Sequence, residues 1–197
     1  MLAVIGDTLT MNLKEKREAL QTAVAAALSA GRLMRQHAHS PKKIHAATRH
    51  DIKLELDVRC QKRIERHLLA RFPDSGVLGE EGVAGNAASP LRWVVDPIDG
   101  TVNFTYGIPH ACVSVALETR DPDSASGFQA VVGVVFEPFS GELWTAIRGQ
   151  PARLNGRRVR VSNRRRLEDT VVSVGFGKDA EALNRMLPMV QRLVHRV

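Results

Sequence analysis

The feature that most restricts the fold is a series of short apolar runs, each separated from the next by residues typical of turns. The runs are Val77–Leu78, Trp93–Val95, Ala111–Leu117, Ala130–Phe136, Leu143–Ala146, Val159–Val161 and Thr170–Val174. Each has the length of a strand rather than of a helix. Because the connections between them are short, neighbouring runs are expected to pair as a largely antiparallel sheet.

Helical and extended segments flank this series. Asn12 to about His39 has apolar residues at helical spacing, and Ser40-Pro41 interrupts the pattern. Lys43–Asp57 alternates apolar and charged residues, which predicts a strand pair. Asp57–Phe72 returns to helical spacing, and Asp179–Val197 is helical again. The order of these segments predicts a mixed α/β (α+β) fold.

The composition favours a globular protein, with 44% hydrophobic residues in 197. The longest uncharged apolar runs, Ala23–Ala30 and Ala111–Leu117, are far shorter than the roughly 18 to 20 residues of a membrane span. Met1–Asn12 lacks the pattern of a secretory signal, so a cytoplasmic location is expected. Cys60 and Cys112 lack metal-type spacing and are expected to be reduced thiols without a catalytic role.

The net charge of +7 raises the question of nucleic-acid binding. Much of the excess lies in one stretch, at Arg157, Arg158, Arg160, Arg164, Arg165 and Arg166. Few aromatic residues interleave with these arginines, so stacking on bases is disfavoured. Solvation of an exposed hairpin, or attraction of an anionic phosphate ester, explains the stretch equally well. We therefore do not expect nucleic acid as the main partner.

Three acidic clusters stand beside the apolar runs or open a predicted helix: Gly79-Glu80-Glu81-Gly82, Asp96–Thr101 and Asp57. Carboxylates held at the ends of strands are suited to hard cations such as magnesium, which prefers oxygen ligands and shares phosphate oxygens with a substrate. Taken singly, Asp-Gly is a common turn and a glutamate pair between glycines is commonly a solvated loop. The combination favours a metal site, whereas the seven histidines show no clustering with cysteine of the kind that zinc requires.

Within Asp96–Thr101, Pro97 restricts the backbone, so that Asp96 and Asp99 are expected to point to the same side. The carbonyl of Ile98 stays available as a ligand. Gly100 allows a phosphate to approach the amides of Gly100 and Thr101. The Thr101 hydroxyl is suited to orient a water molecule. Phosphate-loop and serine-hydrolase motifs are absent, which excludes those classes of hydrolase.

The segment Trp93–Phe104 resembles the signature of the inositol monophosphatase family. Gly79-Glu80-Glu81 and Asp57 precede it in the expected order, and Gly149 and a Leu154–Gly156 hairpin follow. The resemblance covers roughly Asn12 to Val197. It implies a layered α/β/α/β/α sandwich of the inositol monophosphatase and fructose-1,6-bisphosphatase type, a magnesium requirement, frequent inhibition by lithium, a homodimer, and hydrolysis of small phosphate monoesters.

The resemblance also implies roles for individual residues. Metal ligands would be Glu80, Asp96, the carbonyl of Ile98 and Asp99, with Asp57 contributing to a weaker site. Glu80 and Thr101 would orient the attacking water, and Asp99 would share in catalysis. The substrate would contact Glu80, Ile98, Asp99, Gly100 and Thr101.

Members of this family continue beyond the point that corresponds to Val197, and their later part carries another metal-binding aspartate and the residues that hold the alcohol. We therefore expect residues 1–197 to be one domain of this type with its carboxy-terminal part missing, weakly active or inactive alone. The substrate stays open among inositol monophosphate, fructose 1,6-bisphosphate, histidinol phosphate and a nucleotide 3′-phosphate. A non-catalytic metal-binding or interaction module with the same fold is the alternative function.

Overall fold

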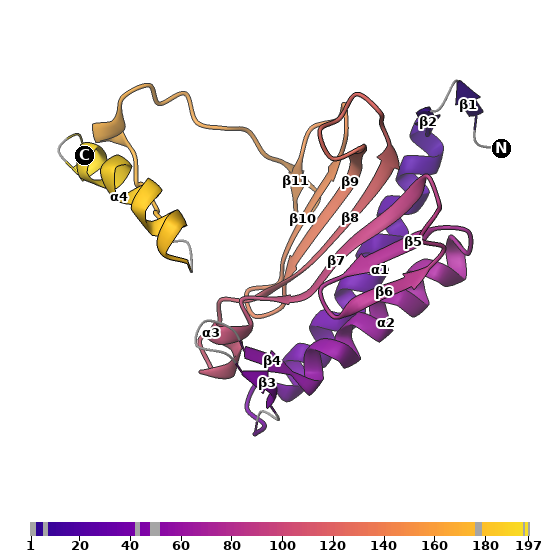
Figure 1. Cartoon of the computed structure of the whole chain (residues 1–197), viewed down its shortest axis with the longest axis horizontal. Helices are drawn as coiled ribbons and strands as arrows, with labels where there is room; N and C mark the ends of the chain where they lie inside the picture. Colours follow the sequence, from indigo (N-terminus) through magenta and orange to yellow (C-terminus); the bar gives the residue numbers. More distant parts are fainter. Residues whose placement is uncertain are drawn as a thin grey trace. The chain divides into compact units, whose positions relative to one another are not determined.

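The computed structural model describes residues 3–5, 8–41, 44–47, 52–175, 179–194 and 196. The chain forms two compact units, Met1–Val159 and Arg160–Val197, and each is described by itself. Figure 1 colours the chain from its amino terminus in indigo to its carboxy terminus in yellow.

The first unit is built on an eight-stranded sheet with the order β12-β11-β10-β9-β8-β7-β5-β6. The strands are β5 (Gly76–Gly79), β6 (Gly82–Gly85), β7 (Leu91–Asp99), β8 (Cys112–Arg120), β9 (Phe128–Glu137), β10 (Glu142–Ile147), β11 (Arg153–Leu154) and β12 (Arg157–Arg158). Every neighbouring pair is antiparallel except β5 and β7, which are parallel. The expected antiparallel sheet is therefore confirmed, with one parallel pair that the sequence did not reveal.

Two apolar runs expected as strands are not strands. Val159–Val161 and Thr170–Val174 have no regular structure, and a short 3-10 helix, η1 (Leu167–Asp169), lies between them. The side chains of Val161 and Val171 are 94% and 98% exposed. Short apolar runs become strands only when a partner strand supplies hydrogen bonds and burial, and neither run has one in the described part of the chain.

Helix α1 (Leu13–His37) covers one face of the sheet beside α2, as Figure 1 shows. Asn12 caps it: the side chain of Asn12 accepts from the amide of Glu15, and the Glu15 carboxylate accepts from the amide of Asn12. The buried stripe of α1 is rich in alanine. Small residues let the helix lie close to the sheet, and a Cβ at Gly31 would lie 2.4 Å from the ring of Phe136.

Helix α2 (Glu55–Arg71) begins two residues before the expected start at Asp57. The reason is a cap: Asp57 Oδ2 accepts a hydrogen bond from the amide of Leu54 at 2.6 Å, which makes Asp57 the third helical residue. The strands before it, β3 (Ile44–Ala47) and β4 (Ile52–Leu54), pair antiparallel, which confirms the predicted strand pair. At its other end Phe72 packs edge-on against the buried ring of Trp93.

The remaining elements lie near the chain ends. Strands β1 (Ala3–Ile5) and β2 (Thr8–Thr10) form an antiparallel pair that the sequence did not predict. In the second unit, α4 (Ala180–Val194) confirms the expected carboxy-terminal helix. None of the helices in the described ranges is long and apolar enough to cross a bilayer.

Candidate functional site

The parallel pairing of β5 and β7 brings two of the acidic clusters together. Gly79 at the end of β5 lies opposite Val95 of β7, and the amide of Glu80 donates to the carbonyl of Val95 at 3.2 Å. Glu80 therefore starts a turn directly beside Asp96. Because the two strands run in the same direction, both acidic residues leave the sheet at the same edge.

A bulge in β7 brings Asp99 to the same place. Asp96 lies opposite Ser114 and Asp99 opposite Cys112, so the step between the aspartates is one residue longer on β7 than on β8. In a regular strand, residues three apart point to opposite faces. The bulge, which contains Pro97, corrects this, and the Asp99 charge reaches Asp96. The two aspartates therefore lie close enough to interact electrostatically.

The electrostatics of this group are unfavourable without a cation. Burial, followed by the charges of Glu80 and Asp99, raises the pKa of Asp96 to about 7. Its Oδ1 atom is buried and receives no hydrogen bond. A buried acceptor without a donor, beside two more carboxylates, is an environment that a positive ion would stabilise.

The turn after β7 places the remaining residues. Gly100 has a left-handed backbone with φ 89°, and a Cβ there would lie 2.8 Å from the carbonyl oxygen of His110. It is the N-cap of a short helix, α3 (Thr101–Thr105), which the sequence did not predict. The Thr101 hydroxyl donates to the carbonyl of Ile98 at 2.8 Å, so this carbonyl is partly engaged within the turn.

Sequence reasoning missed Gln61, a 3% exposed residue of α2. Its Oε1 accepts from the amide of Glu81 at 2.8 Å, and its Nε2 donates to the carbonyl of Gly82 at 3.1 Å. The signal was available, because Gln61 is a polar residue on the buried face of α2, one turn from Asp57 and beside Ile64.

Oxygen donors at this edge fit a hard divalent cation such as magnesium in their chemistry. Glu80 and Asp99 are exposed, Asp96 is half-buried, and Asp57 is 3% exposed with one carboxylate oxygen on the Leu54 amide. Within the described ranges, no three His, Cys, Asp or Glu side chains already stand in the geometry of an ion-binding cluster. The residues therefore fit a divalent cation through their donor type, oxygen, and through their negative charge.

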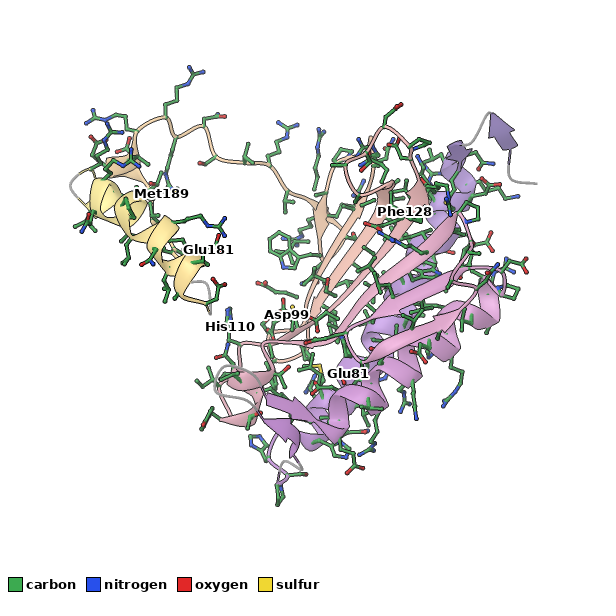
Figure 2. The ribbon with its side chains drawn as sticks, in the orientation of Figure 1. Glu81, Asp99, His110, Phe128, Glu181 and Met189 are labelled. Atoms are coloured by element: carbon green, nitrogen blue, oxygen red, sulfur yellow. The ribbon has the colours of Figure 1, made fainter. Side chains whose placement is uncertain are left out.

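Figure 2 shows Asp99 near the end of the sheet where the strands meet α3, with His110 on the segment that leads into β8. The protein is thus a mixed α/β sandwich with acidic residues at the ends of its parallel strands β5 and β7. The model of the inositol monophosphatase family matches residues 15–192, and the chain belongs to this family.

Curated relatives agree with this assignment. The chain is 39% identical over 165 residues to the Nus factor SuhB of Xylella fastidiosa, covering 82% of this chain and 56% of the relative. It is 34% identical over 187 residues to inositol monophosphatase 2 of Solanum lycopersicum, covering 91% and 68%. The chain thus spans between about half and two thirds of the length of such relatives.

Solved structures confirm the mixed α/β sandwich. The extragenic suppressor protein SuhB of Bartonella henselae superposes with a TM-score of 0.82 at 34% identity, covering 91% of this chain and 68% of that one. The inositol monophosphatase of Anabaena superposes with a TM-score of 0.74 at 26% identity, covering 91% and 64%.

Proposed function

We propose that the protein hydrolyses a small phosphate monoester with the help of magnesium, and that inositol monophosphate is the substrate. The observation that carries this proposal is the convergence of Glu80, Asp96 and Asp99 at one edge of the sheet, next to the open backbone of Gly100. Support also comes from relatives that are named inositol monophosphatases.

In this proposal the cation is held by Glu80, Asp96, Asp99 and the carbonyl of Ile98, with Asp57 at a further site. Magnesium, when bound, would polarise the phosphate and lower the pKa of a coordinated water. The carboxylates supply the negative charge that the cation requires, and the rigid end of β7 fixes two of them relative to each other.

The residues of the chain would orient the water and the phosphate. The Thr101 hydroxyl donates its proton to the Ile98 carbonyl, so its oxygen would accept a hydrogen bond from a proton of a water molecule. Glu80 is the nearest exposed carboxylate in the turn beside Asp96 and would accept that proton. Amides at Gly100 and Thr101 head α3, where helical amides lack intrahelical acceptors, and would donate to phosphate oxygens.

The experiment is phosphate release from inositol 1-phosphate with and without magnesium, on this chain and on the Glu80→Gln variant. We expect magnesium-dependent release, weak from residues 1–197 alone and stronger from a chain extended at its carboxy terminus, and a loss of at least about a hundredfold in Glu80→Gln, the usual contribution of a positioned general base. Glu81→Gln is the matched control because it neutralises the neighbouring carboxylate. An equal loss of phosphate release in both variants, or phosphate release that does not depend on magnesium, contradicts the proposal.

On the same family basis we propose that residues 1–197 belong to one domain and that the protein is a cytoplasmic homodimer. We also propose that residues beyond Val197 are needed to complete the site for the alcohol. Phosphate release only from a chain extended at its carboxy terminus would support the view that residues 1–197 are one truncated domain. Sedimentation of that longer chain as twice its monomer mass would support the dimer.

An interaction role is a second candidate, because two relatives at 39% and 34% identity are named Nus factors. The exposed arginines at 157, 158, 160, 164, 165 and 166 are the feature that favours it. Nucleic-acid binding through these arginines would weaken steeply as salt is raised, because counterions are released. Binding that is absent, or independent of salt, excludes this role for the arginines.

A further inference from the structure

The β9–β10 turn, residues 138–141, is organised around Glu137, the last residue of β9. Glu137 Oε1 accepts from the amide of Phe139 at 2.7 Å, and its Oε2 accepts from the amide of Ser140 at 2.6 Å. The carbonyl of Glu137 accepts from the amide of Gly141 at 3.0 Å. Three consecutive amides of the turn therefore bond to this one residue, two of them through its side chain.

The Glu137 carboxylate is held as an anion. Burial alone would raise the pKa of Glu137, but the hydrogen bonds from Ser140 and Phe139 and the nearby charge of His110 lower it. Hydrogen bonds to a charged acceptor are shorter and stronger than those to a neutral one. At neutral pH the two side-chain bonds to the turn are therefore of the strong kind.

The start of the turn is fixed against α1. The residues on either side of Glu137, Phe136 and Pro138, are both buried. A Cβ at Gly31 of α1 would lie 2.4 Å from the ring of Phe136 and 3.3 Å from Pro138. Since β9 meets α1 this closely on both sides of Glu137, the carboxylate projects from a firmly placed base.

The far side of the turn supports the helix that carries the proposed phosphate-binding amides. Phe139 packs against Phe104 of α3, with ring centroids 6.3 Å apart and an angle of 36° between the rings. Phe104 is 2% exposed, and its amide donates to the carbonyl of Gly100 at 3.0 Å. A helix of five residues is not stable by itself and depends on packing, here against Phe139 and against β4, which lies beside α3 in Figure 1.

We propose that Glu137 is a positioning residue of the candidate site, which fixes Phe139 against Phe104 and thereby holds the amides of Gly100 and Thr101 at the head of α3. The inference rests on the proposed function, in which these two amides bind phosphate. The effect travels through the turn and the two rings, from β9 to α3.

A direct electrostatic effect of Glu137 would have the opposite sign. Glu137 and Gly100 line the same cavity of about 370 Å³, so the carboxylate is a negative charge near the proposed phosphate position. Like charges brought together disfavour binding. Neutralising Glu137 should therefore improve phosphate binding if its charge alone matters, and should weaken phosphate binding if the carboxylate positions α3.

The first test is phosphate release from inositol 1-phosphate in magnesium by the chain extended at its carboxy terminus. In Glu137→Gln we expect kcat/KM to fall at least about tenfold, since misplacing a substrate-positioning group by about 1 Å costs up to about a hundredfold. Glu142→Gln is the matched control, because Glu142 lines the same cavity and its side chain bonds to Trp144. This control should not lower kcat/KM. An unchanged or higher kcat/KM in Glu137→Gln overturns the inference.

A double-mutant cycle tests the path through Phe139. Once Phe139 is replaced by alanine, Glu137 has no ring to position, so adding Glu137→Gln should lower kcat/KM by less than about a further twofold. Losses that multiply in the double variant contradict this path. If Phe139→Ala does not fold, as judged by urea unfolding, Phe139→Leu takes its place because it keeps an apolar side chain.

Hydrogen exchange on residues 1–197 separates this inference from the proposed function. In Glu137→Gln the amide of Phe104 should exchange at least about tenfold faster, because α3 loses a support made of charge-assisted bonds, while the amides of β8 keep their rates. Unchanged exchange at Phe104, or an equal acceleration in β8, overturns the inference. If the exchange result holds but the extended parent chain releases no phosphate, only the proposed hydrolysis fails.

Discussion

Gly79 lies directly against the carboxamide of Gln61, so closely that a Cβ on Gly79 would stand 2.3 Å from the Gln61 side chain. The missing side chain lets Gln61 reach past β5 and hydrogen-bond to the backbone of Glu81 and Gly82. These bonds hold Glu81 and Gly82, the two residues that follow Glu80. Gln61 is therefore a positioning residue for the candidate site.

Replacing Gln61 by alanine should destabilise the protein by about 1–3 kcal/mol, because three part-buried hydrogen bonds are lost, to Glu65, the Glu81 amide and the Gly82 carbonyl. Urea unfolding measures this loss. Phosphate release should show a lower kcat, since Glu80 is no longer fixed. Lys62→Ala, at an exposed neighbouring position of α2, should leave both quantities unchanged. A stable Gln61→Ala protein with unchanged kcat would contradict the assigned role.

Alanine at Gly100 should cost more than alanine at Gly107. Both glycines have a positive φ, 89° and 73°, so both substitutions carry the left-handed penalty of about 1–2 kcal/mol. A Cβ on Gly100 would stand 2.8 Å from a carbonyl oxygen, whereas nothing lies within 4 Å of the same position on Gly107. Urea unfolding of the two variants separates backbone strain from collision. Equal destabilisation would show that the contact with His110 has no energetic weight.

Magnesium should raise the thermal stability of the parent chain and not that of Asp96→Asn. A ligand that binds only the folded state at a hundred times its Kd stabilises by about 2.7 kcal/mol. Without magnesium the asparagine variant should be at least as stable as the parent, because burial and two neighbouring carboxylates disfavour the Asp96 charge. Thermal unfolding with and without the metal checks both statements. The control variant Asp74→Asn changes an exposed residue and should keep the magnesium response. If Asp74→Asn also lost that response, the effect of Asp96→Asn would be non-specific.

The thiol of Cys60 should react with iodoacetamide far more slowly in the folded chain than in urea. Burial, followed by the charge of Asp57, raises the pKa of Cys60 from 9.0 to about 12. At pH 8 the higher pKa lowers the thiolate fraction by about a thousandfold. The alkylation rate falls with it, because only the thiolate reacts. Since the folded pKa is the higher one, the rate should rise with pH throughout the range below 12. Mass spectrometry in a Cys112→Ser background measures this; rapid labelling of the folded chain would contradict it.

The sequence could predict a turn that carries Asp96 and Asp99 because the signals for it are local. Asp96, Pro97 and Asp99 are close along the chain, so the proline, the spacing and the following glycine indicate one turn. The position of Glu80 beside this turn depends on parallel pairing of β5 with β7, which requires β6 to be the edge strand. Gly82–Gly85 is too short and too rich in glycine to be predicted as a strand, so the strand pairing that places Glu80 beside this turn was not predicted, although the family resemblance already implied Glu80 as a ligand.

Long-range contacts account for the other differences. Val159–Val161 has the composition of a strand, but composition does not show that a partner strand is missing. The position of Gln61 on the apolar face of α2 marks it as unusual, but its partners become evident only when the turn at Glu81 is placed over it. The helices were predictable because their caps and spacing are local, although Asp57 as a cap moved the start of α2 by two residues.

The packing of α1 also sets an order of events during synthesis. Gly31 is made early, yet the ring that packs against it belongs to Phe136, more than half the chain later. A helix of α1's length gains most of its stability from the surface it covers rather than from its own hydrogen bonds. During translation α1 can pack against α2 early but lacks the surface of β9 until β9 has left the ribosome, and its alanine-rich stripe, which is only weakly apolar, limits attraction to other partners in the meantime.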